Sequence, residues 1–304
     1  MNPTTVDELR RRLAAQAGLP TTGVVREPIR VWRLSGVERL RAIGTSVVFK
    51  YALPPFTGEH RVLTWVAAQG VPVPEVRAAM TLDGMLGMIL DDLGPPVRAP
   101  TEHDATALAA HLHTVAPAPW LDRLGEPDLA ALPGRALACL DQLRATGRFA
   151  DADDLVGWLH RLDRMAETRA VGAERPPFGQ LHGELHPTAV HISATGRYLL
   201  DFAMAITGPG LLDLAAWSGL RLPANPARTR WLIEQYVHHG GHPDAVTDRG
   251  GLPAERWTLG WHRVEAAHWL LSCGADGIDA PDTDPRHIVV LRRQLTGALD
   301  LLAT

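Results

Sequence analysis

The segment QLHGELHPTAVHISATGRYLLDFAMAITGPGLLDLA, Gln180–Ala215, sets histidines and carboxylates beside short apolar runs. His182, Glu184 and His186 alternate along the chain, so in an extended conformation they would share one face. A second apolar run then leads into Asp201. If the two runs are strands joined as a hairpin, Glu184 and Asp201 would come together and could hold a cation beside a nucleophile.

Two kinds of zinc site begin with a similar pattern, and the spacing opposes both. A metalloprotease helix reads H-E-x-x-H, whereas Glu184 is two residues after His182. A zinc deaminase needs a later P-C-x-x-C, which Cys139 and Cys273 cannot supply because they lie far apart. Zinc is therefore disfavoured, and the two cysteines are expected to be buried, reduced thiols.

Upstream of this segment the pattern is that of a small antiparallel sheet. Between Ile29 and Lys50, runs rich in Val, Ile, Trp and Phe are separated by Gly and Ser, which predicts β-hairpins. Thr57–Gln69 follows helical spacing, and two further apolar runs occupy Arg77–Thr81 and Met85–Leu90. We therefore predict a sheet with one helix up to residue 93.

Helical spacing dominates after residues 91–96, with a loop-rich interruption at Phe178–Phe202. The predicted helices are Thr101–Val115, Leu137–Leu143, Ala152–Ala170, Leu211–Leu220, Arg228–His238, Ala254–Leu271 and Pro285–Leu302. A β-rich lobe over residues 1–93 and a mostly helical lobe over residues 94–304 predict an α+β fold, not an alternating βαβ fold.

Bulk properties exclude several classes of protein. Hydrophobic residues make up 46% of the 304 residues, but no apolar run is long enough for a transmembrane helix. The N-terminus lacks the apolar stretch of a secretory signal, so a cytoplasmic protein without a membrane partner is expected. A net charge of -4 and no basic stripe argue against nucleic acid as a partner.

Lys50 is the only lysine among 30 basic residues, and all the others are arginine. It ends the apolar run Ser46–Phe49. Where arginine serves every other cationic position, a retained lysine indicates a site that requires a compact ammonium group.

HGELHPTAVHI, residues 182–192, resembles the HGDLHPGNVLV-type catalytic loop of aminoglycoside phosphotransferases and the related choline and macrolide kinases. LLDFAMAITGPGLLDLAAW, residues 199–217, resembles the segment that follows that loop, and VVFK and MILDDLG resemble the family's lysine strand and hinge. A branch of the family with HGE in place of HGD fits best. The resemblance covers residues from about 30 to 220 and implies a protein-kinase-like two-lobed fold.

The resemblance implies that ATP or GTP phosphorylates a hydroxyl of a small molecule, such as an antibiotic in self-resistance, or a metabolic sugar or amino alcohol. It implies that Lys50, held by Glu59, contacts the α- and β-phosphates and that Asp201 binds Mg²⁺. Glu184 would accept or orient the proton of the attacking hydroxyl, and His186 would face the γ-phosphate.

The same resemblance places the backbone of Asp91 and Leu93 against the purine, and His182 as a brace for the catalytic loop. No Walker A loop competes for the nucleotide, because the only lysine is in VVFK and not in GK[ST].

Ala189 stands where the family carries a metal-binding asparagine, and alanine cannot ligate a metal. The longer Glu184 side chain, Thr188, His191 or a water is a candidate replacement. SGVERLRAIG, residues 35–44, is at best an irregular phosphate loop. The alternative hypothesis is a pseudokinase-like protein that binds a nucleotide or another ligand without transferring phosphate.

Two features of the C-terminal part have simpler explanations. Trp257 and Trp261 lie one helical turn apart, and core packing is favoured over a platform for stacking a substrate. An acidic loop could hold a cationic ligand, but a solvated loop is favoured. Its acids are Asp276, Asp279, Asp282 and Asp284.

Overall fold

The computed structural model describes residues 3–20, 22–219 and 222–303. By their contacts these residues form two compact units. The first comprises Met1–Asp104 with His182–Ala205, and the second Ala105–Leu181 with Ile206–Thr304. The segment with Glu184 and Asp201 therefore belongs to the same unit as Lys50. The lobe boundary between residues 93 and 94 stays a prediction.

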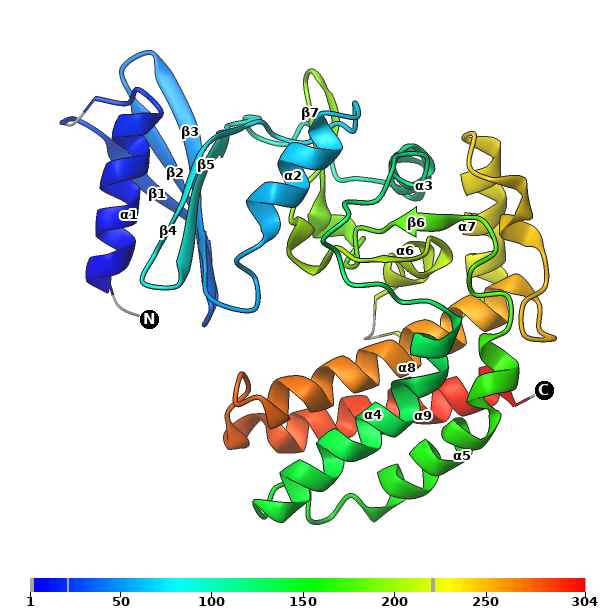
Figure 1. Cartoon of the computed structure of the whole chain (residues 1–304). Coiled ribbons are helices and arrows are strands. Elements are labelled where there is room, and N and C mark those ends of the chain that lie inside the picture. Colours follow the sequence, from blue (N-terminus) through cyan, green and yellow to red (C-terminus); the bar gives the residue numbers. More distant parts are fainter. Residues whose placement is uncertain (1–2, 21, 220–221, 304) are drawn as a thin grey trace. The chain divides into compact units, whose positions relative to one another are not determined.

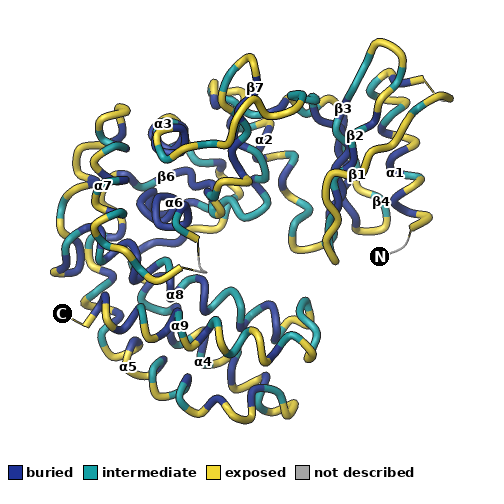
Figure 2. The backbone as a smooth tube through the Cα atoms, turned by 180° about the vertical axis from the view of Figure 1, so that it is seen from behind, coloured by how far each residue is buried: buried dark blue, intermediate teal, exposed yellow. Residues whose placement is uncertain are grey.

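A five-stranded antiparallel sheet with strand order β1-β2-β3-β5-β4 forms the base of the first unit (Figure 1). Its strands are β1 (Val25–Val31), β2 (Ser35–Ala42), β3 (Thr45–Ala52), β4 (Val76–Leu82) and β5 (Met85–Asp91). The strands predicted between residues 29 and 90 are all present. β1 is an edge strand whose seven residues are all exposed, and its tube is yellow in Figure 2.

A helix that the sequence reading missed, α1 (Pro3–Gln16), packs on β4 and β5. Its Val6, Leu9 and Leu13 are buried in one cluster with residues of the sheet, including Phe49. The prediction of one helix in this region is therefore wrong. Arginines and other polar residues fill the outer face of α1, so the segment is polar on average. Its few core-facing apolar residues therefore did not stand out in the sequence.

The predicted helix after β3 is α2 (Glu59–Ala67), with Glu59 buried in its first turn. In the same unit, β7 (Val190–Ser193) and β8 (Gly196–Leu199) form a hairpin. The short 3-10 turn η2 (Phe202–Met204) follows the hairpin and contacts α2. These elements bring Glu59 and Asp201 toward the strand that carries Lys50.

The second unit is mostly helical, and its main core lies among α4, α5, α8 and α9 (Figure 1). Its elements are the remainder of α3 (Glu102–Leu112), α4 (Glu126–Ala145), α5 (Asp153–Ala170), β6 (Phe178–Gln180), β9 (Thr207–Pro209), α6 (Leu211–Ala216), α7 (Pro226–His238), α8 (Ala254–Ala275) and α9 (Asp284–Leu302).

Several predicted helices have different bounds in the structure, and α4 and α6 are two of them. α4 is much longer than Leu137–Leu143 and continues through a buried Pro133, a residue that normally argues against a helix interior. α6 ends at Ala216, and Leu220, the end of the predicted helix, lies outside the described residues.

Trp257 and Trp261 are fully buried, and both indole N–H groups donate to the Arg169 carbonyl oxygen, at 2.7 and 3.1 Å. Core packing of this pair is therefore confirmed.

Of the acidic-loop residues, Asp284 accepts two hydrogen bonds from Arg148, at 2.9 and 2.6 Å. Within the described ranges no helix has the length and apolarity needed to cross a membrane.

Candidate functional site

Lys50 lies on β3 in the first unit, between two carboxylates. Its Nζ is 2.6 Å from Glu59 Oε2 and 2.7 Å from Asp201 Oδ1. Lys50 and Glu59 are 7% and 2% exposed. The expected ion pair between Lys50 and Glu59 is present. The direct contact between Lys50 and Asp201 was not predicted from the sequence.

Charge pairing decides the ionisation of Lys50 and Asp201. Burial alone would lower the pKa of Lys50, but the Glu59 and Asp201 carboxylates raise it above its ordinary value. Burial would likewise raise the pKa of Asp201, yet the Lys50 ammonium group holds it below its ordinary value. At neutral pH the site therefore presents an ammonium group against an ionised Asp201.

The backbone turns sharply at Asp201. The residue has φ 66° and ψ 62°, in the left-handed region, and β8 ends two residues earlier at Leu199. The expectation that Asp201 ends a strand is therefore wrong. Aspartate is one of the few residue types that enters this region readily. Such a conformation often marks a functional site, and here it directs the carboxylate to Lys50.

His182 joins the two halves of the chemical segment. Its Nε2–H donates to the Leu200 carbonyl oxygen at 2.7 Å, and its Nδ1 accepts from the Glu184 N–H at 3.3 Å. Its ring centroid is 4.6 Å from that of Phe202. The two hydrogen bonds select the neutral tautomer and confirm the bracing role expected of this histidine.

The expectation that His182 shares one face with Glu184 and His186 is wrong. Gly183 has φ 85°, which breaks the extended conformation, so His182 is fully buried while Glu184 is open to solvent. Glycine is required there, because a Cβ at this position would lie 2.0 Å from the Met204 carbonyl oxygen.

Gly183→Ala is therefore expected to lower the free energy of unfolding by about 3 kcal/mol or more, through backbone strain and the clash with Met204. Gly84→Ala is the matched control. Gly84 also has a positive φ, 76°, but its added Cβ would meet no atom within 4 Å. Only the strain of about 1 kcal/mol is expected there. Urea unfolding measures both, and equal losses would contradict the close approach to Met204.

Glu184 and His186 lie on the loop after His182. Although the Glu184 side chain reaches solvent, the protein atoms packed around its carboxyl group, and after them the Asp201 carboxylate, raise the pKa of Glu184 above its ordinary value. Burial lowers the pKa of His186, against the opposing effect of Asp201. His186 Nδ1 is 3.1 Å from Thr188 Oγ1. These directions favour a carboxylate that accepts a proton readily and a largely neutral imidazole at pH 7.

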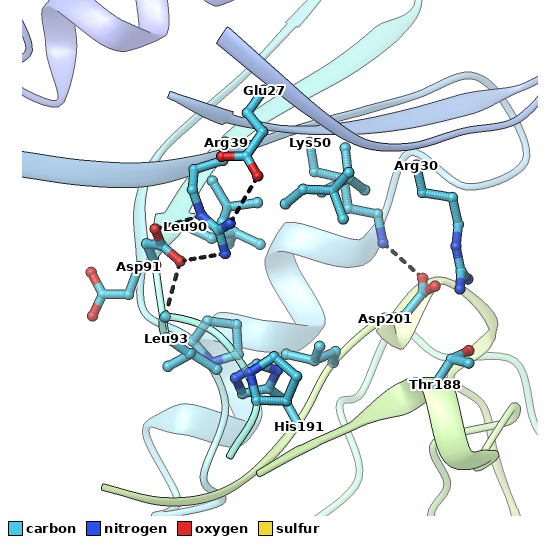
Figure 3. Close-up of a pocket in the computed structure, with 18 of the residues that line it drawn as sticks. Glu27, Arg30, Arg39, Lys50, Leu90, Asp91, Leu93, Thr188, His191 and Asp201 are labelled. Atoms are coloured by element: carbon cyan, nitrogen blue, oxygen red, sulfur yellow. Dashed lines mark hydrogen bonds and ion pairs between the residues drawn. The ribbon is translucent and has the colours of Figure 1, made fainter. Parts of the chain in front are cut away.

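The position of the expected asparagine is closed to solvent. Ala189 is fully buried, and its carbonyl oxygen accepts from the Leu200 N–H at 2.8 Å. Thr188 lies near Asp201 in Figure 3. His191 lies beside Leu93 instead, and burial lowers its pKa while a hydrogen bond to the Leu93 backbone opposes this. Of Thr188 and His191, two of the candidate replacements, Thr188 is therefore the better placed.

A cavity of about 590 Å³ in the first unit brings most of the predicted residues together (Figure 3). Lys50, Glu59, Asp91, Leu93 and Asp201 all line it, whereas Glu184 and His186 lie on the loop beside Asp201 and do not. Its apolar walls include Val37, Val48, Leu63, Leu90 and Leu200. A cavity of this size, with both apolar walls and charged side chains, suits a nucleotide.

The sequence reading missed a polar network at the hinge. Arg39 Nε donates to Asp92 Oδ2 at 2.8 Å, Ser46 Oγ donates to the same oxygen at 2.5 Å, and the Gly94 N–H donates to Asp92 Oδ1 at 3.0 Å. Burial would raise the pKa of Asp92, but these hydrogen bonds hold it below its ordinary value. The network fixes the chain between Asp91 and Leu93. Only the DDLG run gave a signal for it.

Asp201 is the candidate ligand for Mg²⁺. Among the residues that the structure describes, no group of three or more His, Cys, Asp or Glu side chains could hold a metal ion. Mg²⁺ does not need such a group, since it commonly binds one or two carboxylates, substrate phosphates and waters. The ionised Asp201 carboxylate on the wall of the cavity fits this requirement.

Comparison with protein families matches residues 30–250 to the phosphotransferase enzyme family, APH. A search of curated proteins found no match. Among solved structures, an aminoglycoside-3'-phosphotransferase of type VIII is 21% identical, with 88% of this chain and 100% of that chain covered and a TM-score of 0.57.

A choline/ethanolamine kinase family protein from Mesorhizobium loti is 16% identical, with 97% and 99% covered and a TM-score of 0.61. A thermostable mutant of the aminoglycoside phosphotransferase APH(4)-Ia, in a ternary complex with ADP and hygromycin B, is 14% identical, with 95% and 98% covered and a TM-score of 0.59. At these identities the likeness shows the protein-kinase-like fold.

Proposed function

This chain belongs to the phosphotransferase enzyme family and is a small-molecule kinase, and we propose that it moves the γ-phosphoryl group of ATP or GTP to a hydroxyl. The observation that carries the proposal is the placement of Lys50 between Glu59 and Asp201, at 2.6 and 2.7 Å, on the wall of the cavity. Phosphoryl transfer relies on such charge placement more than on covalent chemistry.

In the proposed reaction the acceptor oxygen attacks the γ-phosphorus. A new P–O bond forms to the acceptor, the bond from the γ-phosphorus to the β–γ bridging oxygen breaks, and the nucleoside diphosphate leaves with that oxygen. The hydroxyl proton passes to the Glu184 carboxylate, whose raised pKa favours its acceptance. Lys50 binds the α- and β-phosphates, and His186 faces the γ-phosphate from the loop.

Asp201 would hold Mg²⁺, which when bound neutralises charge on the phosphates. On nucleotide binding, Lys50 would exchange its contact with Asp201 for contacts with phosphate oxygens and keep its ion pair with Glu59. The lysine would then be positioned before the substrate arrives, which reduces the reorganisation needed at the moment of reaction.

The apolar walls of the cavity support binding of the purine between β2 and β3 on one side and Leu200 on the other, with hydrogen bonds to the backbone of Asp91 and Leu93. A main chain offers both N–H donors and C=O acceptors, so it can form hydrogen bonds with either adenine or guanine. We therefore propose ATP or GTP as the donor. For the acceptor we propose a hydroxylated small molecule, such as an antibiotic, a sugar or an amino alcohol.

One observation favours a second candidate, a protein that binds nucleotide without transferring phosphate. Ala189 is buried and has no donor atom in its side chain, so one metal ligand of the family is missing. Lys50, Glu59, Glu184 and Asp201 are all present, and for this reason we favour the enzyme.

Thermal stabilisation of the wild type, Lys50→Ala and Lys50→Arg by ATP and GTP, with and without Mg²⁺, tests the proposal. A nucleotide at 100 times its Kd should stabilise the wild type by about 2.7 kcal/mol. Both variants should lose most of this gain, since a planar guanidinium cannot replace the compact ammonium group between two carboxylates.

No stabilisation of the wild type by either nucleotide would contradict the proposal. Stabilisation without release of ADP or GDP, across a panel of aminoglycosides, sugars and choline, would favour the binding protein.

A further inference from the structure

The register of β1 on β2 contains an irregularity that reorients one arginine. Glu27 pairs with Arg39 and Arg30 pairs with Val37, so three steps on β1 match two steps on β2. Side chains alternate between faces of a strand, and without this bulge Glu27 and Arg30 would point to opposite faces. With it both reach the cavity face, and both line the cavity.

Arg30 and Lys50 lie in one row across the sheet. Arg30 pairs with Val37, and Val37 pairs with Lys50 on the next strand. Paired residues point to the same face, so both cations project from the side of the sheet that covers the cavity. Two strand spacings separate them by about 10 Å between Cα atoms. In Figure 3 the Arg30 side chain extends toward Asp201.

Arg30 differs from the other two basic residues of the cavity in having no carboxylate partner. Arg39 is paired with Asp92 at 2.8 Å, and Lys50 with Glu59 and Asp201. No ion pair to Arg30 occurs within the described ranges. Its guanidinium carbon lies 4.7 Å from the ring centroid of Trp32, which orients the group without neutralising its charge.

The turn above the phosphate end lacks the usual means of binding phosphate. Kinases cover the phosphates with a glycine-rich loop, whose backbone N–H groups can approach them closely. Here SGVERLRA is strand β2, and the connection from β1 is Trp32–Leu34, which contains no glycine. Residues 35–44, by sequence at best an irregular phosphate loop, form β2 and the turn that follows it. Ala189, in addition, removes a metal ligand from the opposite side.

We propose that Arg30 binds the β- and γ-phosphates of the nucleotide, and that its hydrogen bonds and positive charge compensate here for the missing glycine-rich loop and the missing metal ligand. This inference rests on the proposed phosphotransferase function. A guanidinium suits the role, because it donates two parallel hydrogen bonds to a phosphate and its charge persists at any physiological pH.

The test compares Arg30→Ala, Arg30→Lys and wild type by calorimetric titration with ATP, ADP and AMP in the presence of Mg²⁺. Arg33→Ala is the matched control, since Arg33 lies on the same hairpin but does not line the cavity. Arg30→Ala should bind ATP about ten- to a hundredfold more weakly, with AMP affinity unchanged. The ATP affinity of Arg30→Lys should lie between those of Arg30→Ala and wild type, and the ATP affinity of Arg33→Ala should equal that of wild type.

Equal ATP affinity in Arg30→Ala and wild type would overturn the inference and leave the phosphotransferase function standing. An equal loss of affinity for ATP and AMP would also overturn it, because AMP lacks the β- and γ-phosphates. Arg30 would then maintain the shape of the site that binds the base. A wild type that binds none of the three nucleotides would overturn both proposals. Unchanged melting temperatures without nucleotide establish that the variants fold.

Discussion

Asp201→Asn is expected to reduce the rate of phosphoryl transfer about a thousandfold while the protein stays folded. The Lys50 ammonium group keeps the pKa of Asp201 low, so the wild-type side chain is an ionised hard-oxygen ligand at neutral pH. Asparagine keeps the shape of the side chain, and it also tolerates the left-handed backbone at φ 66°. The substitution therefore removes the charge without breaking the turn.

Asp83→Asn is the matched control, because Asp83 also has a positive φ, 51°, but lies in the turn between β4 and β5. Its turnover of Mg-ATP to ADP should equal that of wild type. The assay runs without an acceptor, where water takes the phosphoryl group, and with an acceptor found by screening. An Asp201→Asn protein with more than a tenth of the wild-type rate would contradict the assignment of Asp201 to the metal.

The parts of the site that sequence predicts are those set by short-range pattern. A lone lysine at the end of an apolar run, a glutamate at the start of the next helix and the HGE segment each have a local signature. Lys50 on β3 and Glu59 on α2 are nine residues apart in the sequence. Their ion pair therefore depends only on the segment that connects this strand to this helix. This pair is in the structure as expected.

The parts that sequence does not predict depend on register or on distant pairing. Lys50 and Asp201 are 151 residues apart, and their contact depends on a left-handed turn that no propensity singles out. Arg39 and Asp92 are 53 residues apart. The direction of Arg30 depends on one extra residue in β1, and the alternation of the sequence by itself gives the wrong face.

At Ala189 the sequence identifies a feature but not its effect. It indicates that a metal ligand of the family is missing at this position, but which residues could compensate depends on the side chains that lie nearby in space. Thr188, Arg30 and Asp201 all line the cavity, and His191 lies at the hinge. A compensating charge thus comes from the sheet, about 160 residues away in the chain from the substituted position.

Glu184→Gln is expected to slow phosphoryl transfer by about a hundred- to ten thousandfold, since glutamine cannot accept the hydroxyl proton. In the wild type the rate should fall as the pH is lowered, because protonation of Glu184 removes the base. The midpoint should lie above the ordinary glutamate value of 4.5, given the raised pKa. Glu184→Gln should lack this limb of the pH profile.

Stability should change in the opposite sense to activity. A carboxyl group whose pKa is raised by folding destabilises the folded protein once the pH exceeds that pKa. Replacing Glu184 should therefore leave the protein at least as stable as wild type at pH 7. The exposed Glu75 provides the control, and Glu75→Gln should change neither rate nor pH profile. Full turnover in Glu184→Gln would reject Glu184 as the base, and an unchanged acid limb would assign that limb to another group.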